Sequence, residues 1–160
     1  MIRMIVKGLT MDPASNSPIL ILEDPDTEQS LPIWIGLLEA TAIASELEEV
    51  EFSRPMTHDL LRNIIGALDH SISKVEVCDL KDNTFYALIH LMGPQGAQVI
   101  DSRPSDAIAV ALRAKAPIFV AEKVLEESQS AMVPDQSQSE QEWREILDKM
   151  DPQDFGKYKM

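Results

Sequence analysis

The 160-residue chain shows the same pattern twice, in two stretches offset by 67 positions without gaps. The offset aligns Ile33 with Ile100 and Glu39 with Asp106, so apolar positions meet apolar positions and acidic positions meet acidic ones. A fixed internal period indicates that one supersecondary unit occurs twice. Each unit reads as three strands followed by a helix. The sequence therefore predicts an α+β fold in which a mixed sheet packs against helices, built by an internal β-β-β-α duplication.

The spacing of apolar residues predicts the individual elements of both units and of the segments around them. Polar turn-forming residues, such as those at 81–83, separate the strands. The expected strands cover residues 2–10, 18–22, 31–35, 72–78, 84–91, 98–101 and 117–120, and the expected helices cover 37–50 and 57–70 and begin again near 104.

Changes in composition along the chain predict one domain with an appended tail. We expect the domain to cover residues 1–125, a flexible Ser- and Gln-rich linker to cover 126–139, and a C-terminal helix and tail to cover 140–160. The tail helix has an apolar face, which should dock either on its own domain or on a second subunit. That face consists of Trp143, Ile146, Leu147 and Met150.

The charge and the cysteine content restrict the function. A formal net charge of −13 has the wrong sign for a protein that binds nucleic acid by neutralising phosphates over a broad surface. Any nucleic-acid role therefore needs a local basic site or bound metal ions. Cys78 is the single cysteine, which excludes an internal disulfide and fits a reducing compartment. No segment is long enough to span a membrane, so we expect a soluble, cytoplasmic protein with no membrane partner.

The stretch VIDSRPSDAIAVALR, residues 99–113, joins a strand to an alanine-rich helix. A purely structural interpretation explains part of it. Either Ser102 or Ser105 would cap the helix, Pro104 would sit in its first turn, and Asp106 would face the positive end of the helix dipole. On this interpretation Asp106 chiefly starts the helix.

Asp101 and Arg103 are left unexplained by the start of a helix. Their counterparts in the first unit are Trp34 and Gly36, which carry no charge, so a structural duty shared by both units does not account for them. They could form a structural ion pair with each other. The alternative, which we take as the working hypothesis, is that both point into a groove and serve binding or catalysis.

A second polar cluster precedes the helix expected at 57–70. Thr57 and Asp59 suit the start of that helix, as cap and as dipole partner. His58 could be an exposed residue of the first turn, or a general base, since histidine changes protonation near neutral pH. Arg54 could bind a phosphate with two hydrogen bonds.

Five blocks of the sequence, in this order and spacing, resemble the bifunctional nuclease family. The resemblance covers about residues 1–125, and the final segment KMDPQDFGKYKM is similar to the end of bacterial members. It implies an α+β domain that forms a wedge-shaped homodimer with a large groove, and an activity on both DNA and RNA. The blocks are LPIWIGLLEATAIA, RPMTHDLL, DNTFYALI, IDSRPSDAIAVALR and APIFV.

The residues also favour a homodimer independently of the resemblance. The strand expected at 31–35 is apolar on both of its faces, and such a strand needs cover on both sides.

Two functions compete at this point. In the first, the protein is a metal-assisted nuclease: carboxylates hold a divalent cation such as Mg²⁺ or Mn²⁺, which activates water, while arginines stabilise the charge that develops on the phosphate. In the second, it is a non-catalytic dimeric module that binds an anionic ligand or a partner protein. The first assigns Glu39, Asp101 and Asp106 to the metal, and Arg54, His58, Asp101 and Arg103 to catalysis.

Overall fold

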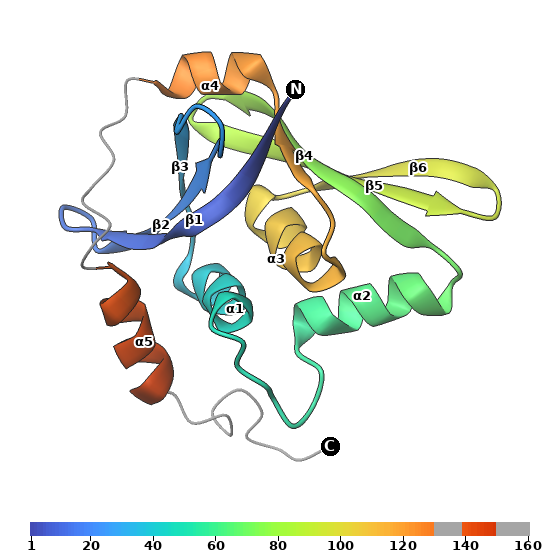
Figure 1. Ribbon diagram of the computed structural model, residues 1–160, viewed down its shortest axis with the longest axis horizontal. Helices are drawn as coiled ribbons and strands as arrows, with labels where there is room; N and C mark the ends of the chain where they lie inside the picture. Colours follow the sequence, from blue (N-terminus) through green and yellow to red (C-terminus); the bar gives the residue numbers. More distant parts are fainter. Residues whose placement is uncertain (130–138, 150–160) are drawn as a thin grey trace.

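The structure, a computed structural model, describes residues 1–129 and 139–149. Seven strands form one sheet in the order β3-β2-β1-β7-β4-β5-β6 (Figure 1). The pairing of β4 with β7 is parallel and the other pairings are antiparallel, so the sheet is mixed. The strands are β1 (Ile2–Asp12), β2 (Ser17–Glu23), β3 (Ser30–Trp34), β4 (Ser71–Lys81), β5 (Thr84–Gly93), β6 (Gly96–Ser102) and β7 (Ile118–Val120); the helices are α1 (Leu37–Leu47), α2 (Thr57–Ala67), α3 (Pro104–Ala114), α4 (Glu122–Ser128) and α5 (Ser139–Lys149).

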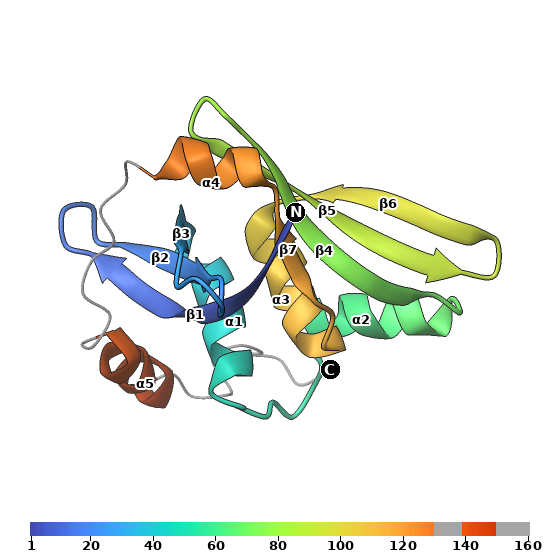
Figure 2. The same cartoon turned by 45° about the horizontal axis from the view of Figure 1, so that its top comes forward.

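The sheet curves around a group of three helices. Helix α4 contacts both β3 and β4, although β2, β1 and β7 lie between them in the sheet, and only a strongly curved sheet allows both contacts. Helix α3 lies between α1 and α2 and also contacts β4 and β5 (Figures 1 and 2). The first turns of α1, α2 and α3 line one pocket.

The α+β fold with a mixed sheet is confirmed, and each expected strand and helix is found within a few residues of its expected bounds. Helix α4 is an addition: its last three residues, 126–128, occupy the start of the predicted linker. Of the other linker residues, Gln129 follows α4, Ser139 begins α5, and 130–138 lie outside the described residues. No helix in the described part of the chain is long and apolar enough to cross a membrane.

Helix α5 docks on its own chain, against β1 and α1. Trp143 is 3% exposed, and Ile146 and Leu147 pack against the core, so three of the four predicted apolar positions face the domain. The fourth, Met150, lies outside the described residues. Docking of this helix on its own domain, one of the two outcomes left open by the sequence, is the one observed.

The two units have the same strand order, counted outwards from β7: β1-β2-β3 on one side and β4-β5-β6 on the other. Helices α1 and α3 follow the third strand of their units, and α2 has no counterpart in the second unit. The duplication itself stays a prediction. A superposition of residues 2–49 on 69–116 tests it, because unrelated units would not align strand for strand.

Helix α3 is the central helix of the domain. Eight of its eleven residues are buried, among them Ala107 at 1% exposure and Ala111 at 0%. Small side chains at this spacing let α3 approach its neighbours closely. Close packing of this helix fixes the position of its first turn, which carries Asp106.

We expect Ala111→Leu to lower the free energy of unfolding by about 1–3 kcal/mol, because three added carbon atoms do not fit into a filled interior. Urea denaturation measures the change. Ala67→Leu, at an exposed position on α2, is the matched control and should change stability by less than about 0.5 kcal/mol. Equal effects of the two substitutions would contradict the central placement of α3.

Candidate functional site

A pocket of about 340 Å³ opens where α1, α2 and α3 meet. The first turns of the three helices contribute to its lining. Its apolar lining residues come from α1 and from the segment before α2. The polar and charged residues that line it are Glu39, Thr41, Ser45, Thr57, His58, Arg103, Asp106 and Arg113.

Arg103 is the centre of the charged part of this pocket. Its Nε donates to Asp106 Oδ2 at 2.9 Å, and its Nη1 donates to Glu39 Oε1 at 2.9 Å. These two contacts use two of the five N–H donors of the guanidinium. The side chain is 63% exposed, so the remaining donors face solvent. Arg103 thus bridges α1 and α3 and keeps donors free for a ligand.

Asp106 also contacts His58 at the start of α2. The distance from His58 Nε2 to Asp106 Oδ1 is 2.9 Å. Burial alone would raise the pKa of Asp106, but the hydrogen bonds from Arg103 and His58 outweigh burial and hold that pKa below its usual range. An ionised carboxylate only accepts hydrogen bonds, so His58 Nε2 carries the proton. In the neutral ring, the lone pair is then on His58 Nδ1.

Glu39 completes the group of four, which we call the helix-start cluster: Glu39, His58, Arg103 and Asp106. A hydrogen bond from its own backbone N–H, followed by the bond from Arg103, lowers the pKa of Glu39. Its carboxylate folds back over Gly36, where the Cβ of any other residue would collide with it. Glycine at position 36 is therefore needed for this conformation of Glu39.

Arg113 fixes the three helices relative to one another. Its side chain is 2% exposed. Nε donates to Asp59 Oδ1 of α2 at 2.9 Å, Nη2 donates to the Ala42 carbonyl of α1 at 2.9 Å, and Nη1 donates to the Ala109 carbonyl of α3 at 2.9 Å. Sequence reasoning missed this residue. A signal was present, since Arg113 is the one charge in the otherwise apolar later turns of α3.

The expected helix caps are wrong in detail. The N-cap of α2 is Met56 rather than Thr57, and its backbone N–H donates to Asp59 Oδ2 at 3.0 Å. The N-cap of α3 is Arg103, with no side-chain cap from Ser102 or Ser105. The carboxylates of the first turns therefore do more than favour the helix dipole, because Asp59 and Asp106 each hold an arginine. The expectation that Asp106 chiefly starts its helix is incomplete for the same reason.

Two of the predicted catalytic residues are not brought into the helix-start cluster. Asp101 is exposed on β6, opposite Leu88, and Arg54 is exposed before α2. Neither lines the pocket, and neither side chain forms a hydrogen bond or ion pair with another described residue. Their catalytic roles stay predictions without a contact that supports them. The pairing of Asp101 with Arg103 is replaced by the pairing of Arg103 with Glu39 and Asp106.

The donor set does not fit a divalent metal in this arrangement. Among the described residues, no three or more His, Cys, Asp and Glu side chains are placed to hold a metal ion. Of the predicted ligands, Glu39 and Asp106 both bind Arg103, and Asp101 is outside the cluster. The guanidinium occupies the place between the two carboxylates that a cation would need.

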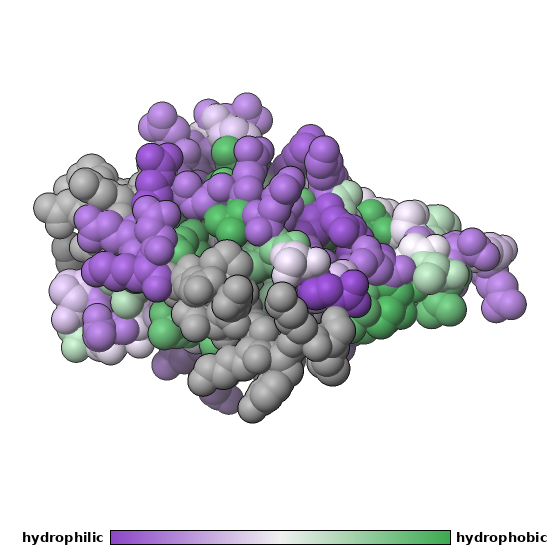
Figure 3. Space-filling model, turned by 90° about the horizontal axis from the view of Figure 1, so that it is seen from below, coloured by the Kyte–Doolittle hydropathy of each residue, from purple (hydrophilic) through white to green (hydrophobic). Residues whose placement is uncertain are grey.

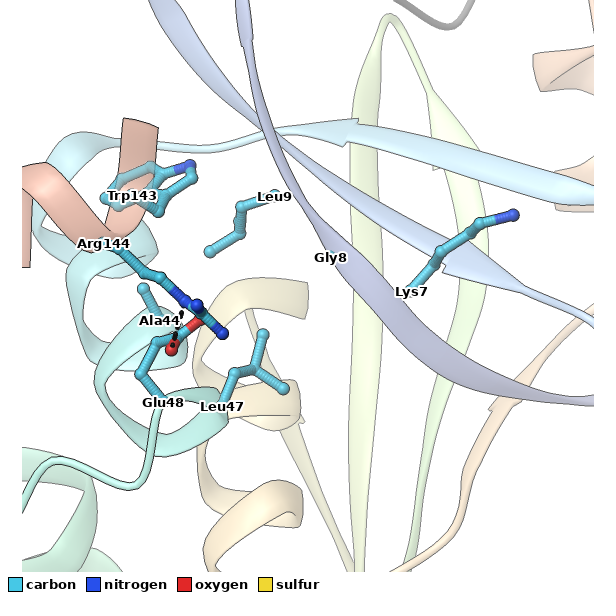
Figure 4. A pocket seen from close by; sticks show the side chains of 8 residues that line it. All are labelled: Lys7, Gly8, Leu9, Ala44, Leu47, Glu48, Trp143 and Arg144. Carbon is cyan, nitrogen blue, oxygen red and sulfur yellow. Dashed lines mark hydrogen bonds and ion pairs between the residues drawn. The ribbon is translucent and has the colours of Figure 1, made fainter. Parts of the chain in front are cut away.

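A second pocket, of about 270 Å³, lies between β1, α1 and α5 (Figure 4). Arg144 of α5 reaches across it and donates from Nε to Glu48 Oε2 of α1 at 3.2 Å. None of the predicted site residues lines this pocket. We therefore place the candidate functional site at the helix-start cluster.

The lowered pKa of Asp106 predicts a pH dependence of stability. A carboxyl group whose pKa is lower in the folded state stabilises the fold above its unfolded pKa, near 3.8, and this contribution is lost as the pH falls through the folded pKa. We expect Asp106→Asn to lose less stability than the wild type between pH 5 and pH 2.5, measured by urea denaturation. Asp101→Asn is the control and should follow the wild type.

Comparison with known proteins identifies the family of the chain. A family model described as the bifunctional nuclease domain matches residues 20–133, which contain the whole helix-start cluster. Uncharacterized protein Rv1829 of Mycobacterium tuberculosis is 41% identical over 160 residues, which are 94% of this chain and 95% of that protein.

The plant relatives are more distant and longer. Bifunctional nuclease 2 of Arabidopsis thaliana is 26% identical over 110 residues, which are 67% of this chain and 33% of that protein. Bifunctional nuclease 1 of Oryza sativa subsp. indica is 23% identical over 116 residues, which are 71% of this chain and 35% of that protein. The chain thus spans about a third of the length of these nucleases. Since a family model covers well over half of the chain, and a relative with 41% identity matches nearly all of it, the chain belongs to the bifunctional nuclease domain family.

Proposed function

We propose that this protein hydrolyses phosphodiester bonds of DNA and RNA at the helix-start cluster. The observation that carries the proposal is the continuous set of contacts from Glu39 through Arg103 and Asp106 to His58, on the wall of one pocket. A histidine held by a carboxylate, beside an arginine with free donors, is an arrangement suited to phosphoryl chemistry. Membership of the bifunctional nuclease domain family and the names of the plant relatives support the same reaction class.

In the proposed reaction, His58 acts as the general base. Its Nδ1 takes a proton from a water molecule, and the water oxygen forms a bond to phosphorus. The P–O bond to the leaving sugar oxygen then breaks, and that oxygen takes a proton from solvent. Water rather than a 2′-hydroxyl is the nucleophile, because DNA has no 2′-hydroxyl and the same site is proposed to act on both substrates. Asp106 keeps Nε2 protonated and so holds the ring in the required tautomer.

Arg103 would stabilise the negative charge that develops on the phosphate oxygens. Its free N–H donors face solvent, where a phosphodiester can reach them. Hydrogen bonds to Asp106 and then to Glu39 raise the pKa of Arg103 further and fix the plane of the guanidinium before substrate arrives. Preorganised donors of this kind are effective because they need no rearrangement during the reaction.

The test is a cleavage assay on purified protein with single-stranded DNA and single-stranded RNA of the same sequence. Cleavage of both, lost in a variant of the helix-start cluster that still folds, supports the proposal. The assay is run in EDTA and with Mg²⁺ or Mn²⁺ titrated in, because a divalent metal remains a prediction from the sequence. Absence of cleavage under all these conditions would overturn the proposal.

The non-catalytic alternative is favoured by one observation: the arginines that line the pocket are already paired with carboxylates, in a chain with a net charge of −13. A module that only binds an anionic ligand or a partner protein would show binding without turnover. The same assay separates the two functions, because the alternative predicts intact substrate together with measurable binding.

We also propose that the protein is a homodimer. The two subunits would meet through a surface other than the strand at 31–35, from which the sequence predicted the dimer. Within the chain Pro32 is already buried, and only Trp34 stays exposed, at 44%. A larger apolar surface lies at the end of the molecule occupied by α2 and the β5–β6 hairpin, where Figure 3 shows hydrophobic residues at the surface. The exposed apolar residues there are Leu60, Leu61, Ile64, Leu68 and Ile100.

Light scattering should give twice the mass of the chain at micromolar concentration. We expect Ile64→Lys to shift the protein to the monomer, because a charge in an apolar interface is left unpaired. Ile5→Lys, at a similarly exposed position on β1, should leave the dimer intact. A monomer mass for the wild type would contradict this proposal.

A further inference from the structure

A third pocket, of about 260 Å³, adjoins the helix-start cluster on its other side. It lies between the end of β3, the β4–β5 turn and the start of α3. Glu39 and Arg103 line both this pocket and the one that contains His58, so their ion pair forms the partition between the two. Two aromatic side chains, Trp34 and Phe85, line the third pocket, together with the polar residues Asn83 and Thr84.

We propose that this pocket binds one unpaired nucleobase of a single-stranded substrate, next to the phosphate held by Arg103. The inference rests on the proposed nuclease function and adds to it how the substrate is recognised. It assigns a binding role to Trp34 and Phe85, which have no part in the chemistry of the helix-start cluster.

Trp34 is suited to base stacking because it is exposed and held in one orientation. Its indole ring is 44% exposed at the end of β3, so a planar ligand can reach it. Its Nε1 donates to Asp12 Oδ2 at 3.0 Å, which fixes the ring while leaving part of its surface open to the pocket. An aromatic side chain that is already oriented loses little entropy when a base stacks on it.

The polar residues of the pocket fit the edge of a base rather than a phosphate. Asn83 and Thr84 are exposed in the tight β4–β5 turn, where Asp82 and Asn83 have φ of 50° and 60°. An amide and a hydroxyl both donate and accept hydrogen bonds, as the edges of nucleobases do. The pocket volume is below the range of roughly 300–1,000 Å³ typical of drug-sized ligands, which suits one base.

The negative charge of the protein also favours recognition through bases over recognition through phosphates. A chain with a net charge of −13 gains little affinity from phosphates, so contacts to uncharged bases have to supply it. Stacking on an aromatic ring is insensitive to negative charge and tolerates every base. It also does not read the sugar, which accounts for one site acting on both DNA and RNA.

Intrinsic tryptophan fluorescence tests the proposal, because the chain has two tryptophans and only Trp34 lines this pocket. The probes are a tetra-deoxyadenylate and a tetra-adenylate with phosphorothioate linkages, which slow cleavage, and the uncharged nucleosides adenosine and deoxyadenosine. Excitation at the red edge of tryptophan absorption avoids absorption by the bases. We expect saturable quenching with each probe, and ribo and deoxy forms that bind within about threefold of each other.

Two substitutions at position 34 separate stacking from a general effect. Binding is measured by fluorescence anisotropy with the tetra-deoxyadenylate carrying a fluorescent label. Trp34→Ala should weaken this binding by about tenfold or more. Trp34→Phe keeps a stacking face and should retain most of the affinity. In this variant Trp143 is the remaining tryptophan, and its fluorescence should not respond to the probes. Thermal melting of both variants checks that they fold.

The result that overturns the proposal is an unchanged affinity in a folded Trp34→Ala variant, or the absence of quenching in the wild type at saturating probe. These outcomes are separate from failure of the nuclease proposal. Binding that depends on Trp34 without any cleavage leaves the base site in place and rejects the catalytic role. Cleavage of both nucleic acids with no contribution from Trp34 supports the catalytic role and rejects the base site.

Discussion

Replacing Arg103 with alanine is expected to lower the rate of nucleic-acid cleavage by about 100-fold or more, while the protein still folds. Loss of one preorganised contact to the charge of a transition state has an effect of about this size. The side chain is 63% exposed and contributes little buried surface, so the melting temperature should change by only a few degrees. Initial rates on single-stranded DNA and RNA, together with thermal melting, measure both effects.

Arg62→Ala is the matched control for this experiment. Arg62 is exposed on α2 and makes its side-chain contacts to its neighbour Asn63, outside the pocket. Arg62→Ala and Arg103→Ala each remove one positive charge from the acidic chain. A general electrostatic effect on substrate binding would therefore appear in both variants. Wild-type rates in a folded Arg103→Ala variant would show that the arginine only joins α1 to α3.

His58→Gln should lower cleavage by about 10²- to 10⁴-fold, the contribution expected of a general base. Glutamine keeps an N–H donor for Asp106 but has no basic nitrogen in place of His58 Nδ1. The substitution therefore separates the two roles of His58, since the contact with Asp106 can persist while the base is lost.

His70→Gln is the control for His58→Gln. His70 lies beyond the far end of α2, and the contact of its Nδ1 is to the Leu68 carbonyl, so it takes no part in the cluster. Cleavage by His70→Gln should match the wild type. A His58→Gln variant that is folded and fully active would remove the general-base role and leave the histidine as a structural partner of Asp106.

The elements of the fold were predictable because their signals are local. Alternation in β4 and helical spacing in α3 reflect which face of each element is buried, and burial is recorded residue by residue in the sequence. The predicted linker was wrong at residues 126–128 for a related reason. Helix α4 is short, with only Val124 and Leu125 buried, so its pattern is too brief to distinguish it from a polar connection.

The candidate site was predictable in its members but not in its pairs. Six residues were proposed from the sequence, and four of them line one pocket: Glu39, His58, Arg103 and Asp106. All four lie at the starts of helices, and the fold brings these helix starts together. The sequence analysis placed Arg103 in a groove together with Asp101, two positions away. Strand β6 instead leaves Asp101 exposed, while α3 begins at Pro104 and directs Asp106 towards α2.

The sequence by itself determined the strands, the helices and the acidic residues in the first turns, since each of these depends on interactions within a few residues. Only the tertiary structure decided that Arg103 would pair with Glu39, 64 positions away, and His58 with Asp106, 48 positions away. Those contacts depend on how closely α1 and α2 approach α3. That approach is set by the small buried side chains of α3 and by Arg113, which contacts all three helices at once.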